Sequence, residues 1–346
     1  MAAKKITMQD IAQACGLSRN TVSKVFNGRG SVPETTRQMV LEKARQMGYH
    51  QMPEPLGRPA VQNRSIAMLP LCMPGRNHYG SNFISNFANR MSREGYTLMI
   101  YEIQPEEHRE CRLPANFVLE NTAGILCIEM FDSRYSEFIC QLGVPVIFSD
   151  TYARADFSAM AGDFISMENT TSSIAVTNHL IALGARALGF VGDHTHCNSF
   201  YERFNGFRTA MARAGLTMDP QICILEPNSA PYGEAAWLVD RLQRMPHLPD
   251  AFVCANDYLA VHLMKALKLM KLRVPEDVMV VGFDDSPEAS VTEPQLSTVR
   301  IPSGEMGFIA AGILPDRIRQ PSLPFRCCYV QTTPLWRAST RDRARP

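Results

Sequence analysis

From residue 65 onward, short apolar runs alternate with amphipathic stretches of helical length, and this alternation constrains the fold more than any other feature of the sequence. Strands that alternate with helices in this way form parallel sheets covered by helices on both faces. The sequence therefore predicts an α/β body. Its predicted strands are 66–71, 97–101, 124–129, 144–149, 188–192, 222–225, 251–254 and 278–283. Its predicted helices are 82–94, 170–183, 201–214, 233–245 and 257–270.

The length of the chain allows more than one folded unit. At roughly 150 residues per domain, 346 residues indicate two or three units. The predicted strands fit two doubly wound parallel sheets better than one. Ligands of such folds bind beyond the carboxyl ends of the strands, so polar residues that follow strands are candidate ligand contacts.

The first fifty residues carry two short helical patterns joined by a tight turn. Thr7 and Asp10 stand three positions apart, which is the spacing of a capping box, and Gly16 ends the apolar pattern that follows. Ser18 then caps a second predicted helix over residues 19–26. Two short helices joined so closely are typical of a helix-turn-helix.

The second of these helices has one apolar and one polar face. At about 100° per residue, Val22, Val25 and Phe26 share an arc that packs on the first helix. The complementary arc offers donors that suit base edges and phosphates. It carries Arg19, Asn20, Ser23, Lys24 and Asn27. A third helix is predicted over residues 34–47, with Met39 or Val40 on its inner side and Gly48 as its stop.

Charge is distributed unevenly along the chain. The whole chain carries a net charge of +1, but residues 1–50 hold eight basic and three acidic side chains, and the remainder is therefore net acidic. A basic head on an acidic body indicates that the head meets a polyanion. The alternative is a three-helix cap domain whose charged face is only solvated.

Composition sets several other classes aside. No stretch approaches the roughly 20 apolar residues of a membrane span, and residues 1–7 lack the apolar core of a secretory signal. The ten cysteines are scattered, most of them within apolar runs, and no C-x-x-C occurs. Such cysteines are typical of reduced core residues, so we expect a cytoplasmic protein.

The head motifs resemble those of a known family. Residues 7–12, 18–28 and 36–37 are similar to the head of the lactose/galactose-repressor family of bacterial transcription regulators, and Thr21–Asn27 follows its T-V-S-[RK]-x-x-N signature. The resemblance implies that Arg19 and Asn20 reach base edges and that Lys24 faces the groove. It also implies phosphate contacts, and these fall on Ser18, Thr21, Asn27 and Tyr49. Arg pairs bidentately with guanine and Asn with adenine, each worth roughly 1–3 kcal/mol of discrimination.

The resemblance continues through landmarks such as 143–150, 179–184, 203–207, 281–285 and 335–340. It implies a two-lobed body similar to periplasmic sugar-binding proteins, with lobe one at about 64–163 and 291–321 and lobe two at about 164–290 and 322–340. It also implies effector contacts between the lobes. These fall on Tyr79, Asp150, Ser199, Arg203, Asn256 and Asp284. We expect the neighbouring acids Asp257 and Asp285 to serve as caps or ion pairs instead.

The chain departs from the family in its linker and in one lobe of the cleft. Residues 50–63 contain Pro53, Pro55, Gly57 and Pro59. We therefore expect an extended spacer here instead of the family's hinge helix. On the cleft, Asn77–Gly80 reads N-H-Y-G where the family usually carries N-P-F-F, which argues against a purine-stacking pocket. Whether Leu56 still inserts into DNA stays open.

These observations lead to one functional expectation with an open alternative. We expect a homodimeric repressor whose DNA-binding domain is residues 1–49 and which binds an inverted-repeat operator. We expect a small molecule, a carbohydrate, to control this binding. The alternative is a regulator of the same fold that senses a protein partner. No enzyme motif was found, no cofactor is expected, and the cluster at 193–197 is a weak metal pattern.

Overall fold

The computed structural model describes residues 6–27, 32–47, 49, 65–71 and 78–340, and they fall into two compact units divided between residues 62 and 63. The Pro-rich stretch 50–63, with Leu56, lies outside the described residues. No described helix is both long and apolar enough to cross a membrane.

The first unit is built from three helices around a small core. They are α1 (Met8–Cys15), α2 (Arg19–Asn27) and α3 (Glu34–Gln46). The capping box of Thr7 and Asp10 is present at the start of α1, and the turn begins at Gly16 with a φ of 65°. The core comprises Ile11, Ala12, Val22, Val25, Phe26, Val40, Ala44 and Tyr49. The helix-turn-helix and the inner face of α2 are thus confirmed, and Val40 rather than Met39 faces inward.

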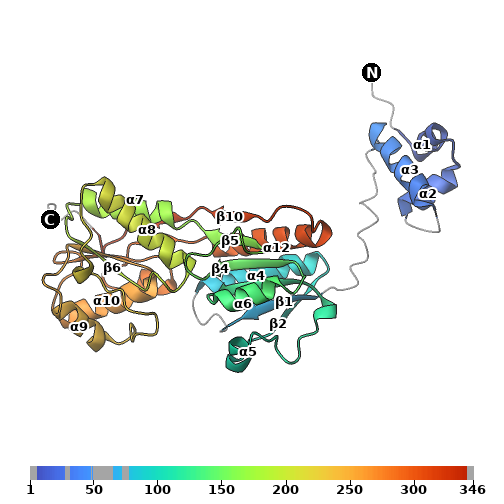
Figure 1. Ribbon diagram of the computed structural model, residues 1–346. Coiled ribbons are helices and arrows are strands. Elements are labelled where there is room, and N and C mark those ends of the chain that lie inside the picture. The colour runs from blue at the N-terminus through green and yellow to red at the C-terminus, as the bar shows by residue number, and fades with distance from the viewer. Residues whose placement is uncertain (1–5, 28–31, 48, 50–64, 72–77, 341–346) are drawn as a thin grey trace, which may run out of the picture. The chain divides into compact units, whose positions relative to one another are not determined.

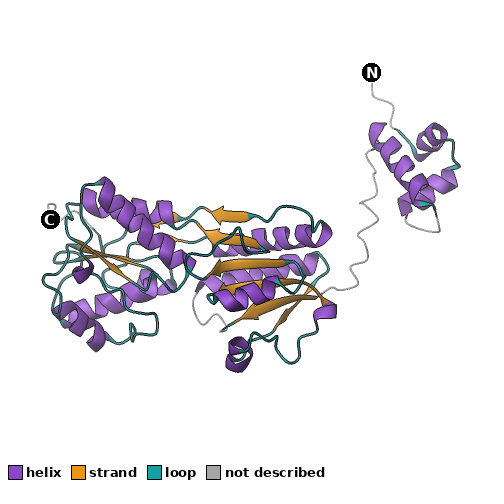
Figure 2. Ribbon diagram, in the orientation of Figure 1, coloured by secondary structure: helices purple, strands orange, loops and turns teal. Residues whose placement is uncertain are grey.

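The second unit contains a larger and a smaller parallel sheet. The larger sheet has the strand order β10-β5-β4-β3-β1-β2. Its strands are β1 (Ser65–Pro70), β2 (Thr97–Ile100), β3 (Thr122–Met130), β4 (Val146–Thr151), β5 (Asp163–Met167) and β10 (Cys327–Val330). Its helices are α4 (His78–Arg93), α5 (Pro105–Arg109), α6 (Ser133–Cys140) and α12 (Ser303–Arg319), with a 3-10 turn at Leu119–Asn121. Figure 2 shows helices in front of this sheet and behind it.

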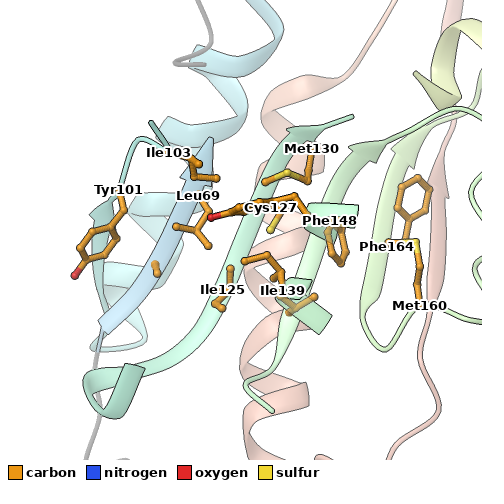
Figure 3. Close-up of a cluster of buried hydrophobic side chains, with 13 residues drawn as sticks. Leu69, Tyr101, Ile103, Ile125, Cys127, Met130, Ile139, Phe148, Met160 and Phe164 are labelled. Carbon is orange, nitrogen blue, oxygen red and sulfur yellow. The ribbon is translucent and has the colours of Figure 1, made fainter. Parts of the chain in front are cut away.

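The alternation of side chains on β1 and β3 divides the core of this lobe between the two faces. Ala67 and Leu69 belong to the cluster that α6 covers with Tyr135 and Ile139, and Figure 3 shows part of this cluster. On the opposite face, α12 packs on α4 and on β3 to β5. Both faces are therefore buried, as continuous apolar strands require.

The smaller sheet has the order β6-β7-β8. Its strands are β6 (Leu188–Val191), β7 (Ala251–Cys254) and β8 (Met279–Val281). Its helices are α7 (Thr170–Ala182), α8 (Asn198–Arg213), α9 (Ala235–Gln243), α10 (Asp257–Leu269) and α11 (Pro287–Val291). An antiparallel pair, β9 (Thr298–Arg300) with β11 (Thr333–Leu335), completes the lobe.

The expected lobe boundaries need three corrections. Residues 298–300 were expected in lobe one but form β9, which pairs with β11 in the smaller lobe. Residues 163–167 and 327–330 form β5 and β10, and both pair within the larger sheet rather than in lobe two (Figure 1). The register of β4 on β5 extends the larger sheet to this edge, because Ile147 and Phe148 pair with Asp163 and Phe164. The chain therefore crosses between lobes three times, after β5, between β9 and α12, and after β10.

The predicted strand 222–225 was wrong. A 3-10 turn at Pro220–Ile222 takes its place, and only Ile224 makes an isolated bridge, to Val191. The physical reason lies in the local sequence. Asp219 accepts a hydrogen bond from the Gln221 amide at 2.9 Å, and Pro220 has no amide hydrogen to donate to a neighbouring strand.

Candidate functional sites: the face of the second helix and a polar cavity

The helix α2 presents the residues expected to contact DNA on its exposed side. Ser18, Arg19, Asn20 and Lys24 are exposed. The Ser18 hydroxyl accepts a hydrogen bond from the Thr21 amide at 3.1 Å and lies 2.8 Å from the Thr21 hydroxyl, so Ser18 is the N-cap of α2. Thr21 and Ser23 are half-buried at the border of this face. The cap thus fixes the start of α2 and with it the positions of Arg19 and Asn20.

Two of the expected DNA contacts stand apart from that exposed face. Tyr49 is buried, and its ring meets Phe26 edge-on at 5.4 Å between centroids. Its ring thus contributes to the core of the head, whatever its hydroxyl contacts. The side chain of Asn27 lies outside the described residues.

A cavity of about 600 Å³ opens in the second unit, and we call it the central cavity. Five of the expected effector residues line it together. They are Asp150, Ser199, Arg203, Asn256 and Asp284. The side chain of Tyr79 lies outside the described residues. The five come from the ends of β4, β7 and β8 and from the start of α8, the edge at which α/β folds bind ligands.

Asp150 connects the two lobes across the cavity. Its carboxylate accepts hydrogen bonds from the Ser199 hydroxyl at 2.6 Å, the Ser199 amide at 3.2 Å and the Thr151 amide at 2.9 Å. Ser199 lies in the first turn of α8, where a helix dipole favours an anion. Burial raises the pKa of Asp150, and these hydrogen bonds partly oppose that effect.

Arg203 is buried and held on several sides. Its Nε donates to Asn169 Oδ1 at 2.9 Å, and its Nη1 donates to the Ala255 carbonyl at 2.6 Å. The same Nη1 lies 3.4 Å from Asp284 Oδ1, and the guanidinium stacks 3.7 Å from the ring centroid of Phe283. These contacts fix the guanidinium before any ligand arrives, which lowers the entropic cost of binding.

The neighbouring acids take the structural roles expected of them. Asp257 accepts from the Thr298 hydroxyl at 2.6 Å and the Ser286 amide at 2.7 Å. Asp285 forms ion pairs with Arg300 at 2.8 Å and Arg337 at 2.6 Å. Asn256 combines two roles, because it lines the cavity and its Oδ1 caps α10 through the Leu259 amide at 3.0 Å.

Further residues of the cavity wall were missed from the sequence. The acids are Glu129 and Glu234, and the aromatic residues include Phe131, Phe200, Tyr232 and Tyr258. A signal for Glu129 was present, because it is the one charged residue at the end of the apolar run 124–129. The loop that carries Tyr232 and Glu234 has no periodic pattern, so nothing in the sequence indicated its position.

Three carboxylates of the cavity sit at backbone angles that residues other than glycine rarely adopt. Glu129, Asp150 and Asp284 have φ values of 53°, 59° and 122°. Such strain costs on the order of 1–3 kcal/mol per residue and gathers at ligand sites. Burial and repulsion from Asp150 raise the pKa of Glu129 to about 7. Burial in the cavity wall raises the pKa of Asp284 to about 8, against the opposing charge of Arg203.

The histidines at 194 and 196 pack against rings. His196 lies 4.7 Å from Phe131 between centroids, and His194 lies 4.4 Å from Phe204. Within the described ranges, no group of three or more His, Cys, Asp or Glu side chains is arranged to hold a metal ion.

Comparison with known proteins agrees with this architecture of a helix-turn-helix head and a two-lobed body. A model of bacterial regulatory proteins of the lacI family matches residues 7–51, and a periplasmic binding protein-like domain matches residues 177–340. The HTH-type transcriptional regulator MalR of Streptomyces coelicolor is 30% identical over 98% of this chain and 99% of its own length. The HTH-type transcriptional repressor PurR of Vibrio cholerae is 28% identical over 90% of this chain and 91% of its own.

Solved structures share the fold. The lac repressor dimer bound to operator and the anti-inducer ONPF matches with a TM-score of 0.69 and 20% identity, over 97% of this chain and 99% of that one. The two units thus define a DNA-binding transcriptional regulator with a ligand-binding domain. The chain belongs to the lacI family of bacterial regulatory proteins.

Proposed function

We propose that the protein is a homodimeric transcriptional repressor of the bacterial cytoplasm whose affinity for an inverted-repeat operator is controlled by a small molecule in the central cavity. The DNA contacts are those of α2, with Arg19 and Asn20 on base edges and Lys24 in the groove. Ser18, Thr21, Ser23, Asn27 and Tyr49 complete the set. One helix-turn-helix makes few contacts, so two heads on one operator are needed for a tight complex.

The observation that carries the effector role is the convergence of five polar residues on one cavity. Asp150, Ser199 and Arg203 are held by hydrogen bonds within it, and Arg203 and Asp284 form a pair that suits vicinal hydroxyls. A volume of about 600 Å³ suits a molecule of sugar or nucleoside size. Among the similar structures, the lac repressor holds both operator and an anti-inducer, which supports this division of labour.

The test measures both halves of the proposal on the full-length protein. Gel shifts with the DNA upstream of its own gene identify an operator, and a thermal-shift screen of sugars, sugar phosphates and nucleosides identifies ligands that raise the unfolding midpoint. A ligand found in this way should change operator affinity. If no small molecule binds and operator affinity is fixed, a protein partner is the controlling signal instead.

Asp284→Asn locates the effector site. Replacing this carboxyl by an amide should weaken ligand binding by about 1–3 kcal/mol, because the amide pairs less well with hydroxyls and with Arg203. Operator affinity without ligand should be unchanged. Asp240→Asn removes a carboxylate from a surface ion pair with Arg244 and serves as the control. If Asp284→Asn abolishes operator binding while ligand affinity is intact, Asp284 transmits the signal and does not bind the ligand.

A further inference from the structure

The central cavity has more acidic than basic side chains. Burial and mutual repulsion raise the pKa of Glu129 to about 7, and burial raises that of Asp284 to about 8, so a bound cation would favour the ionised forms of both. Four carboxylates line it, and Arg203 is the one guanidinium in its described wall. The acids are Glu129, Asp150, Glu234 and Asp284. His196 also lines the cavity, but burial lowers its pKa, so it adds no positive charge at neutral pH. A neutral sugar needs acceptors and donors but no excess of negative charge, and a phosphorylated ligand would be repelled.

Arg203 balances only part of this set of acids. Its Nε donates to Asn169 and its Nη1 to the Ala255 carbonyl and Asp284, and its plane lies against Phe283. Asp150 is stabilised by hydrogen bonds from Ser199 and Thr151 rather than by a direct ion pair. The guanidinium therefore pairs directly with Asp284 and also lowers the pKa of Asp150, whereas no described cation pairs with Glu129.

Glu129 is the acid with the greatest need of a partner. No described side chain or backbone amide donates a hydrogen bond to its carboxylate, although it lines the cavity at the end of β3. Asp150 repels it, and Glu129 in turn repels Asp284. Its backbone adopts a strained φ of 53° at the end of β3. Glu129 is half-buried and reaches the cavity space, so a ligand in the cavity can supply the donor that its carboxylate lacks.

Aromatic rings border the same space. Phe131, Phe200, Tyr232 and Tyr258 line the cavity together with Glu129. Aromatic faces attract cations when water is excluded, and carboxylates bordered by aromatic rings form the usual environment of a bound ammonium group. Arg203 and Asn256 line the same cavity and suit hydroxyl groups.

We propose that the ligand of the central cavity is a small polyhydroxylated amine whose protonated nitrogen lies against the carboxylate of Glu129. This inference rests on the proposed effector role of the cavity. It names the chemical class that the wall selects: hydroxyl groups toward Arg203 and Asp284, and a cation toward lobe one. Neutral analogues bind more weakly, and phosphate esters are excluded.

The test uses matched sets that differ only in the charged group. They are glucosamine, glucose and glucose 6-phosphate; galactosamine, galactose and galactose 6-phosphate; and 5′-amino-5′-deoxyadenosine, adenosine and adenosine 5′-monophosphate. Dissociation constants for the full-length protein at pH 7 are measured by calorimetry. In at least one set we expect the amine to bind roughly 10- to 100-fold more tightly than its alcohol, the effect of one charge-assisted hydrogen bond, and the phosphate not to bind.

Glu129→Gln connects this preference to the proposed carboxylate. The variant should bring the amine's affinity down to that of its alcohol, and cooperative urea unfolding of the variant shows that the fold is intact. Glu102→Gln, a change at an exposed glutamate outside the cavity, should have no effect. The inference is overturned if no amine binds, if an alcohol or phosphate binds more tightly than its amine, or if Glu129→Gln leaves the preference unchanged.

The result also separates this inference from the proposed function. If a neutral or phosphorylated ligand releases the operator, the proposed effector control is supported and the proposal of an amine ligand is wrong. Failure of every ligand to bind or to change operator affinity would contradict both.

Discussion

Glu129 stands out among single residues because the pKa of its carboxyl differs between the folded protein and the unfolded chain. The pKa of its carboxyl rises from an ordinary value of 4.5 to about 7 in the fold, through burial and the repulsion of Asp150. Between these values the native state keeps a proton that the unfolded chain has lost. The contribution of Glu129 to stability therefore falls as the pH rises from about 4.5 to about 7.

Glu129→Gln should remove the loss of stability that the titration of Glu129 causes between pH 4.5 and about pH 7. Without ligand, the free energy of unfolding of the variant should match that of the parent near pH 4.5 and exceed it by about 1–3 kcal/mol at pH 8. Urea unfolding at both pH values measures the difference. Glu102→Gln should show no such trend, since that side chain is exposed. A difference that is the same at both pH values would show that the carboxyl does not titrate in this range.

The sequence predicted the polar side of the cavity better than its acidic and aromatic side. Asp150, Arg203 and Asp284 follow strands or begin helices and match motifs, so their positions could be expected. Tyr232 could not, because its place depends on a loop. The single charge at the end of the apolar run 124–129 marked Glu129 but did not record its backbone angle. A backbone angle and the path of a loop are set by tertiary contacts, and no local pattern records them.

The helices α4 and α12 pack with their backbones close together in the larger lobe. A methyl group at Gly307 would lie 2.1 Å from the Phe83 carbonyl oxygen, and backbone cannot move aside cheaply. We expect Gly307→Ala to lower the free energy of unfolding by about 1–3 kcal/mol or more. Gly304→Ala is the control, because the nearest atom there is the Asn86 side-chain nitrogen at 3.0 Å, which can rotate away. Equal stabilities in urea would contradict the close packing.

A buried ion triad joins β5 to α12 and β10. Asp163 is fully buried and accepts from Arg317 at 3.0 and 3.1 Å and from Arg326 at 3.2 Å. Burial opposes ionisation, yet the hydrogen bonds of the two arginines outweigh it and lower the pKa of Asp163. The stability that this group contributes is therefore present at neutral pH and lost as the pH falls through its lowered pKa.

Asp163→Asn should leave Arg317 as a buried charge without its counter-ion and cost about 3–5 kcal/mol at pH 7. Arg326→Met is the control, since Arg326 is 35% exposed and its loss leaves the Asp163–Arg317 pair in place. Chemical denaturation measures both. If the two variants lose equal stability, the buried pair is not the dominant contact.

Two of the elements that the sequence patterns missed, β5 and α12, have interrupted patterns. The strand β5 reads Asp-Phe-Ile-Ser-Met, so polar residues interrupt its apolar run. The helix α12 contains Gly304, Gly307, Gly312 and Pro315, which are helix-breaking signals in a sequence. Tertiary packing outweighs them, because the glycines allow α12 to approach α4 and Arg90 closely. The strands β1, β3 and β7, with unbroken apolar runs, were predicted nearly at their observed bounds.

At the scale of the whole molecule, basic side chains are concentrated in the head and acidic side chains in the body. The first fifty residues carry eight basic and three acidic side chains, whereas the rest of the chain is net acidic and encloses an acidic cavity. An acidic body is repelled by DNA, so electrostatic attraction acts on the head alone. Binding of the operator should therefore depend on salt through the contacts of two heads only.

This argument gives a prediction for operator binding by the dimer. If each head neutralises on the order of four phosphates, the logarithm of the association constant should fall with the logarithm of salt concentration with a slope of about −7. Arg19→Ala should cost about 1–3 kcal/mol on the operator and little on unrelated DNA, because it removes a base contact. Arg109→Ala, an exposed arginine of the body paired with Glu106, should change neither the slope nor the base preference. Fluorescence anisotropy measures the dissociation constants of the parent and both variants between 50 and 200 mM salt. Over this range the rise in salt should weaken binding by roughly 10³-fold or more. A shallow slope near half this value, with one head on a single half-site, would show that the protein binds DNA as a monomer.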